Sequence, residues 1–191
     1  MNTARLEAFT DGVIAIIITI MVLEIHVPKG HDLAALKEEV PLLLAYVLSY
    51  VNVGIFWNNH HHMLHATERV DGGVLWANLG LLFWLTLVPF VIRWIDEAGF
   101  TAAPVAAYGT VLACAAVSYL ILERTIIAVN GPDSRLAAAV GTDFKGRVSL
   151  ILYVLGIILA FLEPWVSIAM YIAVAGMWLV PDRRIESLVK G

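Results

Sequence analysis

The chain has 191 residues, of which 60% are hydrophobic and 15% charged, and its mean hydropathy is +0.83. Because a soluble domain carries about 25% charged residues, this composition indicates an integral membrane protein. The net charge of -4 comes without any basic run, which argues against a nucleic-acid partner. A single cysteine, Cys114, excludes a disulfide and a thiolate metal site within the chain.

Six apolar segments predict six transmembrane helices, since a helix needs about 20 residues to cross a bilayer. Turn residues separate these segments, among them Pro28, Asp71 and the Glu163-Pro164 pair. We therefore expect an all-α integral membrane fold in which residues 1–191 form a single six-helix transmembrane domain. The expected helices are residues 4–27, 37–65, 72–95, 102–129, 147–162 and 164–181.

The distribution of basic residues predicts the orientation of these helices, because cytoplasmic loops carry an excess of lysine and arginine. Nine of the 12 basic residues fall on the side that holds both termini: Arg5, Arg69, Arg124, Arg135, Lys145, Arg147, Arg183, Arg184 and Lys190. The other side has only Lys29, Lys37 and Arg93. We expect a multi-pass protein of the plasma membrane with both termini in the cytoplasm.

Polar side chains gather at the expected cytoplasmic ends of the first three helices. They include Arg5, Thr10 and Asp11 in the first helix, His60 in the second and Asn78 in the third. A polar group inside a membrane is costly unless it has a partner, so such residues mark functional or structural sites. We predict one network of hydrogen bonds and ion pairs that joins the three helix ends.

The second helix also carries further histidines, at positions 61, 62 and 65. His61 and His65 have the i, i+4 spacing that can share a metal ion. No helix supplies an obvious third ligand, so structural hydrogen bonding is favoured over pH sensing and over a metal or haem site. Since the chain also lacks a nucleophile elbow, a phosphate-binding glycine loop and paired catalytic carboxylates, we expect neither an enzyme nor a cofactor.

One stripe of the first helix combines apolar side chains with a single hydroxyl. Ile16, Thr19, Ile20 and Leu23 stand at i, i+3, i+4 and i+7 and therefore share one face. This face suits the wall of a narrow pore, but it also suits helix packing, because a threonine can bond a carbonyl one turn back. Periodicity alone favours packing. The Thr-Val-Gly-Tyr-Gly filter is absent, which excludes a potassium channel of the usual type.

The residues that precede this stripe resemble a known family signature. Arg5-x-x-x-Phe9-Thr10-Asp11-Gly12 is similar to the Arg-x-x-x-Phe-Ser-Asp motif of the transmembrane protein 175 family. That family comprises the endolysosomal potassium channel and its bacterial relatives. Thr10 departs from the serine of the motif but keeps the hydroxyl, so the local hydrogen bond should survive.

Two further motifs strengthen the resemblance. Trp57-x-x-His60-His61 is close to the bacterial Trp-x-x-His-His pattern at the end of the second helix, and Asn78 is followed in the third helix by Pro89-Phe90. The expected six spans and cytoplasmic termini also agree. The resemblance covers the whole chain, although its specific motifs lie in the first 90 residues.

The resemblance implies a homotetramer in which the first helix of each subunit lines a central pore for potassium and other monovalent cations. It implies permeation without a carbonyl selectivity filter. By position, Ile16 would form the narrowest hydrophobic ring, Thr19 the selectivity ring, and Ile20 and Leu23 further apolar rings. The helix ends would be held together by Arg5, Asp11 and His60. The partners are then other copies of the chain, membrane lipid and permeant K⁺.

Two alternatives use the same polar residues differently. A membrane enzyme or a metal- or haem-binding protein would be built around the cluster from His60 to His65. A proton-coupled carrier would use Asp11 and the histidines.

Overall fold

A computed structural model describes residues 3–28, 30, 32–140 and 143–179, and these residues contain helices and no strand. The helices are α1 (Thr3–Leu23), α2 (Leu33–Glu38), α3 (Val40–His65), α4 (Gly72–Thr86), α5 (Val88–Ala98), α6 (Ala102–Asn130), α7 (Arg135–Val140), α8 (Phe144–Leu159) and α9 (Pro164–Leu179). The prediction of an all-helical fold is confirmed for these residues.

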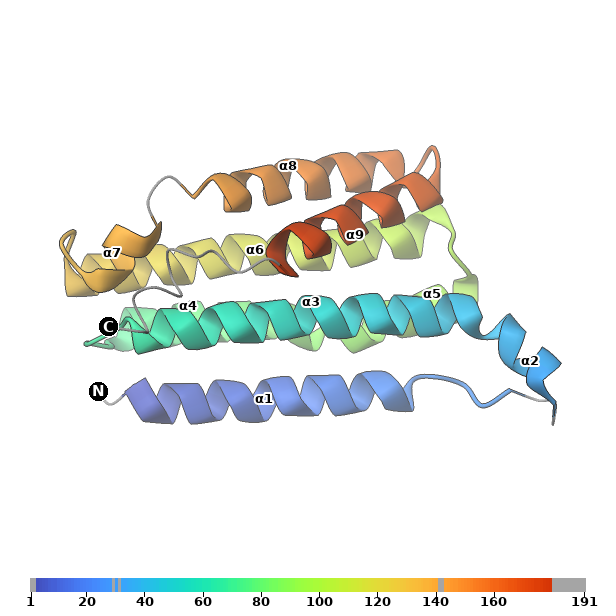
Figure 1. The fold of residues 1–191 in the computed structure, drawn as a ribbon, viewed down its shortest axis with the longest axis horizontal. Helices are drawn as coiled ribbons and strands as arrows, with labels where there is room; N and C mark the ends of the chain where they lie inside the picture. Colours follow the sequence, from blue (N-terminus) through green and yellow to red (C-terminus); the bar gives the residue numbers. More distant parts are fainter. Residues whose placement is uncertain (1–2, 29, 31, 141–142, 180–191) are drawn as a thin grey trace.

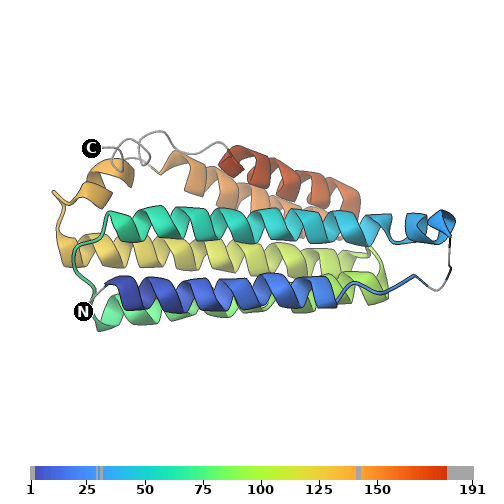
Figure 2. The ribbon, with the colours of Figure 1, turned by 60° about the horizontal axis from the view of Figure 1, so that its bottom comes forward.

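The long helices run along one common axis, with α6 inside the bundle (Figure 1). Helix α6 packs against α4, α5, α8 and α9, and 56% of its most apolar 18-residue window is buried. In α1 only 28% of that window is buried, because α1 lies at the edge of the bundle and packs mainly against α3, α4 and α5 (Figures 1 and 2). One long face of α1 is therefore left uncovered by its own chain.

The two ends of the bundle carry different connections. The start of α1, the turn from α3 to α4, and α7 lie at one end, whereas α2, the α5–α6 turn and the α8–α9 turn lie at the other (Figure 1). The basic residues that the sequence assigns to the cytoplasmic side, from Arg5 to Arg147, belong to segments at the first end. Arg183, Arg184 and Lys190 lie outside the described residues.

Two of the expected helices are each interrupted just before a proline. Segment 37–65 contains the last two residues of α2 and all of α3, and the two helices are separated at Glu39 because Pro41 occupies the first turn of α3. Segment 72–95 is likewise divided at Leu87 because Pro89 occupies the first turn of α5. Proline has no N–H to donate, and it is tolerated at a helix start but not in a helix interior.

Other boundaries move by a few residues. Helix α1 ends at Leu23 rather than at residue 27. Pro28 follows a few residues later and disfavours a helical conformation at Val27. Helix α8 begins at Phe144 rather than at 147, because the side chain of Asp143 caps its start. It ends at Leu159 rather than at 162. Segment 102–129 agrees with α6 within one residue. Helix α9 ends at Leu179, and 180–181 of the expected last helix lie outside the described residues. Helix α7 was not expected.

Four segments of the described chain are long and apolar enough to cross a membrane: α1, α3, α4 with α5, and α6. Helices α8 and α9 have 16 residues each. Such a helix is about 24 Å long, which is less than the roughly 30 Å of the hydrocarbon core. Helix length therefore supports four spans.

Candidate functional site

The stripe that the sequence singles out lies on the uncovered face of α1. Ile16 is 59% exposed, Ile20 40% and Leu23 79%, and Thr19 is exposed between them. The opposite face packs into the bundle through Leu6, Thr10, Ile14, Ile17 and Met21. The four predicted pore residues thus share a face that no other described part of the chain covers.

Thr19 is bound to its own helix in a way that leaves an acceptor free. Its hydroxyl lies 3.1 Å from the carbonyl oxygen of Ala15 and 2.9 Å from that of Ile16, and it donates its proton to them. A hydroxyl has one donor and two acceptor lone pairs. The proton of Thr19 therefore points back along α1, and the lone pairs of its oxygen are available on the exposed face.

Three buried polar side chains connect α1, α4 and α3 behind this face. Asn78 Nδ2 donates to Thr10 Oγ1 over 2.9 Å, and Asn78 Oδ1 accepts from His60 Nε2 over 2.8 Å. None of the three side chains is more than 1% exposed. A buried polar group is costly without a partner, and these bonds form only when the three helices hold one register. The layer fixes how α1 is rotated against its neighbours.

Asp11 and Arg5 lie outside this buried layer. Trp57 Nε1 donates to Asp11 Oδ1 over 2.8 Å, which adds a second link between α1 and α3. Arg5 is exposed, and it forms no ion pair with any residue that the structure describes. The expectation that Arg5 joins the network is corrected for a single chain, because its side chain is on the outer surface of α1.

Glu7 is a site residue that sequence reasoning missed. His61 Nδ1 lies 2.9 Å from Glu7 Oε1, and His65 Nε2 lies 4.0 Å from the same oxygen. Glu7 on α1 therefore supplies the third possible metal ligand, which the sequence did not reveal beside His61 and His65. The signal for Glu7 was its spacing of four residues from Asp11, which brings both carboxylates to the side of α1 that adjoins α3.

Charged residues hold the other end of α1 against α5. Arg93 Nη1 lies 3.3 Å from Glu24 Oε2, and its Nε lies 2.9 Å from Glu97 Oε1. His26, just beyond α1, contacts Asp96. Exposed ion pairs of this kind each contribute little, about 1 kcal/mol or less. Together with the buried layer they attach α1 at both of its ends.

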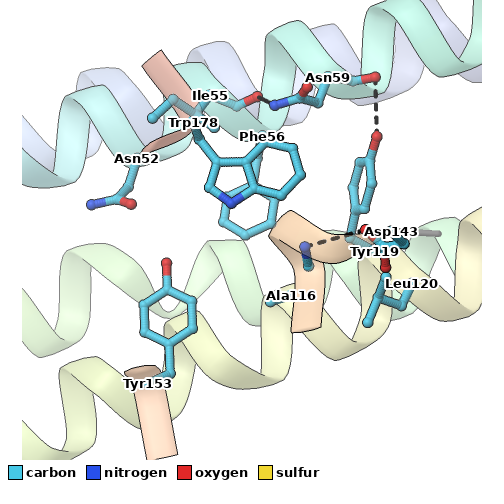
Figure 3. Close-up of a pocket in the computed structure, with 11 residues that line it drawn as sticks. Asn52, Ile55, Phe56, Asn59, Ala116, Tyr119, Leu120, Asp143, Tyr153 and Trp178 are labelled. Carbon is cyan, nitrogen blue, oxygen red and sulfur yellow. Dashed lines mark hydrogen bonds between the residues drawn. The ribbon is translucent and has the colours of Figure 1, made fainter. Parts of the chain in front are cut away.

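A cavity lies elsewhere in the same bundle, between α3, α6, α8 and α9. Figure 3 shows the Trp178 indole among its lining side chains, with the Tyr153 hydroxyl pointing toward α3. Tyr119 Oη donates to the carbonyl oxygen of Asn59 over 3.2 Å. The volume is about 50 Å³, which is room for one or two water molecules. No residue of α1 lines this cavity, so it is separate from the stripe.

The fold and the site define a class of protein. Apolar helices long enough to cross a bilayer, and polar side chains paired between them, describe a helical multi-span membrane protein. Residues 5–89 match the model of a family described as the endosomal/lysosomal potassium channel TMEM175. A protein from Chryseobacterium sp. named as a potassium channel is 50% identical over 190 residues, which are 100% of this chain and 99% of that protein. The chain belongs to the TMEM175 family.

A further relative and a solved structure match nearly the whole length of the chain. A protein from Chamaesiphon minutus, also named as a potassium channel, is 31% identical over 189 residues, covering 91% of this chain and 92% of that one. The crystal structure of a lysosomal potassium-selective channel TMEM175 homolog from Chamaesiphon minutus superimposes with a TM-score of 0.77 at 26% identity, covering 94% and 97% of the two chains. The predicted resemblance is confirmed. The matched residues 5–89 include the exposed stripe of α1, the buried layer of Thr10, Asn78 and His60, and Glu7, His61 and His65.

Proposed function

We propose that the protein is a potassium-permeable cation channel whose pore is lined by α1 on the axis of a homotetramer. The observation that carries the proposal is the exposure of Ile16, Thr19, Ile20 and Leu23 along one face of a helix at the edge of the bundle. Full-length relatives named as potassium channels support it.

A symmetric assembly is needed because one chain cannot enclose a pore with a single stripe. Around a four-fold axis each stripe residue would become a ring of four side chains, and the uncovered face of α1 would acquire partners. A ring of Ile16 narrow enough to shed water would close the pore by dewetting. Ile20 and Leu23, one and two turns further along α1, would add apolar rings.

Thr19 supplies the only oxygen in this stack of side chains. Because its proton is donated to the carbonyl oxygens of Ala15 and Ile16, its lone pairs can replace part of the hydration shell of K⁺. Four neutral hydroxyls exert a weaker field than stacked carbonyl rings. The channel is therefore filterless, with a modest preference for potassium over sodium, and K⁺ is its permeant ion rather than a cofactor.

The anchors of α1 support a pore that opens by small movements. The buried layer of Thr10, Asn78 and His60 holds one end of the helix firmly, whereas the ion pairs of Arg93 at the other end are exposed and weak. A tilt or rotation of α1 about the firm end would change the radius at Ile16 and Leu23.

The topology favours six spans in a single domain of residues 1–191. The described connections alternate between the two ends of the bundle (Figure 1), and α8 and α9 would complete the fifth and sixth crossings with polar or interfacial residues at their ends. The basic residues that the sequence concentrates on one side support an orientation with both termini in the cytoplasm, in a protein of the plasma membrane.

Disulfide trapping combined with flux tests both the channel and its axis. In a Cys114→Ser background, Leu23→Cys should form an intersubunit disulfide on oxidation and reduce K⁺ flux into liposomes. The matched control is Ile151→Cys on α8, whose native side chain is also well exposed at 60%. The proposal is wrong if the unsubstituted protein carries no K⁺ flux, or if Leu23→Cys stays uncrosslinked in an active protein. Saturable, proton-dependent uptake would instead indicate a carrier.

A further inference from the structure

A cluster of three metal-ligating side chains lies between α1 and α3, beside the buried layer. Glu7 projects from α1, and His61 and His65 project from successive turns of α3. Glu7 Oε1 lies 2.9 Å from His61 Nδ1 and 4.0 Å from His65 Nε2, and one ligand atom from each residue lies within 4.8 Å of the other two. The three groups therefore converge on one point.

The chemical type of the three ligand atoms determines which metal ion they suit. Two imidazole nitrogens and one carboxylate oxygen are the ligands that Zn²⁺ takes in sites that keep a fourth position open to water. Ligands at about 2.1 Å around a tetrahedral ion are about 3.4 Å apart. The side chains of His61, His65 and Glu7 are 38%, 52% and 27% exposed, so they have room to rotate inward and an ion can reach them.

The surroundings hold the cluster in place. The ring of Trp57 stacks on that of His61 at 6.1 Å between centroids, while its indole nitrogen is bound to Asp11. The rings of His61 and His65 meet edge to face at 4.3 Å. His61 also follows His60, whose ring is fixed in the buried layer. Ligand orientation is thus partly set before an ion binds.

We propose that Glu7, His61 and His65 form a binding site for a divalent transition-metal ion of the Zn²⁺ type, which bridges α1 to α3. The ion takes the place of the hydrogen that Glu7 and His61 share. Its effect on conduction rests on the proposed function: a bridge between α1 and α3 opposes movement of the pore-lining helix, so Zn²⁺ on the side of Glu7 lowers K⁺ flux.

Calorimetric titration of the purified full-length protein with Zn²⁺ alone tests the site. The expected result is one ion per chain. Loss of a group that merely supports a metal ligand costs about 10–100-fold in affinity, and loss of a ligand should cost at least as much, so Glu7→Gln and His65→Ala should each weaken binding about tenfold or more. His26→Ala is the matched control, because this histidine also pairs with a carboxylate but lies at the other end of α1.

Three results would overturn the site: no saturable binding, binding in Glu7→Gln and His65→Ala equal to that of the unsubstituted protein, or displacement of Zn²⁺ by equimolar Mg²⁺, which prefers oxygen ligands. Circular dichroism of each variant shows whether it has kept its helices. Because titration needs no ion flux, it decides the metal site even if the protein proves not to conduct K⁺. Flux that is unchanged by bound Zn²⁺ would overturn the bridge's effect on α1.

Discussion

Asn78 donates a hydrogen bond of 2.9 Å to Thr10 across the interface of α4 and α1, and neither side chain has any exposed surface. Thr10→Val keeps the shape of the side chain but removes the acceptor, which leaves a buried amide donor without its partner. Such a group costs about 1–3 kcal/mol, so the thermal midpoint in detergent should fall clearly.

Two matched variants accompany Thr10→Val. Thr10→Ser keeps the hydroxyl and should retain most of the stability. Thr110→Val is the control, since its hydroxyl donates to the carbonyl of Ala106 in its own helix and, among the described residues, to no other helix. Equal midpoints for Thr10→Val and Thr110→Val would show that the bond to Asn78 does not stabilise the fold.

Tyr171 limits which side chains α6 and α8 can carry at their closest approach. A Cβ added at Gly109 would clash with the Tyr171 hydroxyl, and one added at Gly156 would lie 2.5 Å from Tyr171 Cε1. Because Tyr171 is fully buried, it has no space into which to move. Gly109→Ala should therefore destabilise the protein by about 1–3 kcal/mol, the usual cost of overpacking a core.

The control for Gly109→Ala is Gly80→Ala, which meets nothing within 4 Å and replaces a helical glycine by a better helix former. Chemical unfolding of both variants in mild detergent measures the difference. If Gly109→Ala were as stable as Gly80→Ala, the close packing of α6 against α9 around Tyr171 would be refuted.

Hydropathy was enough to locate the long helices, but not to find where they break. The apolar pattern continues through Pro41 and Pro89, so hydropathy predicts one unbroken helix across each proline. In the structure a new helix begins at each of these points, with the proline in its first turn. Helix ends depend on single residues such as Asp143, whose capping bond depends on loop geometry that a hydropathy pattern does not contain.

The candidate site, too, could be predicted from the sequence only in part. Polar residues at one end of three helices were sufficient to predict that Thr10, His60 and Asn78 matter, because a membrane interior makes each of them costly alone. Which atoms meet depends on the rotation of each helix about its axis. That rotation buries Thr10, turns Arg5 outward and brings Glu7 to His61, and residue spacing within one helix does not contain it.

Ile16→Asn should raise K⁺ flux into liposomes several-fold at rest. An amide at the ring that we propose as the narrowest would hold water, and a hydrated constriction no longer closes by dewetting. Ile151→Asn is the matched control, because Ile151 is as exposed as Ile16 but lies on α8. If both variants leak equally, the leak comes from general damage and the assignment of Ile16 as the constriction fails.

Thr19 should control the choice between potassium and sodium rather than the passage of ions as such. Thr19→Ala removes the oxygen that faces away from α1, so the permeability ratio of K⁺ to Na⁺ should fall toward one while K⁺ flux persists. Thr19→Ser restores a hydroxyl that can donate to the same carbonyls of Ala15 and Ile16, and it should therefore restore the ratio. Reversal potentials in planar bilayers under mixed-ion conditions give the ratio directly. A ratio in Thr19→Ala equal to that of the unsubstituted channel would mean that selectivity arises elsewhere along the pore, whereas a loss of all current would mean that Thr19 is needed for assembly.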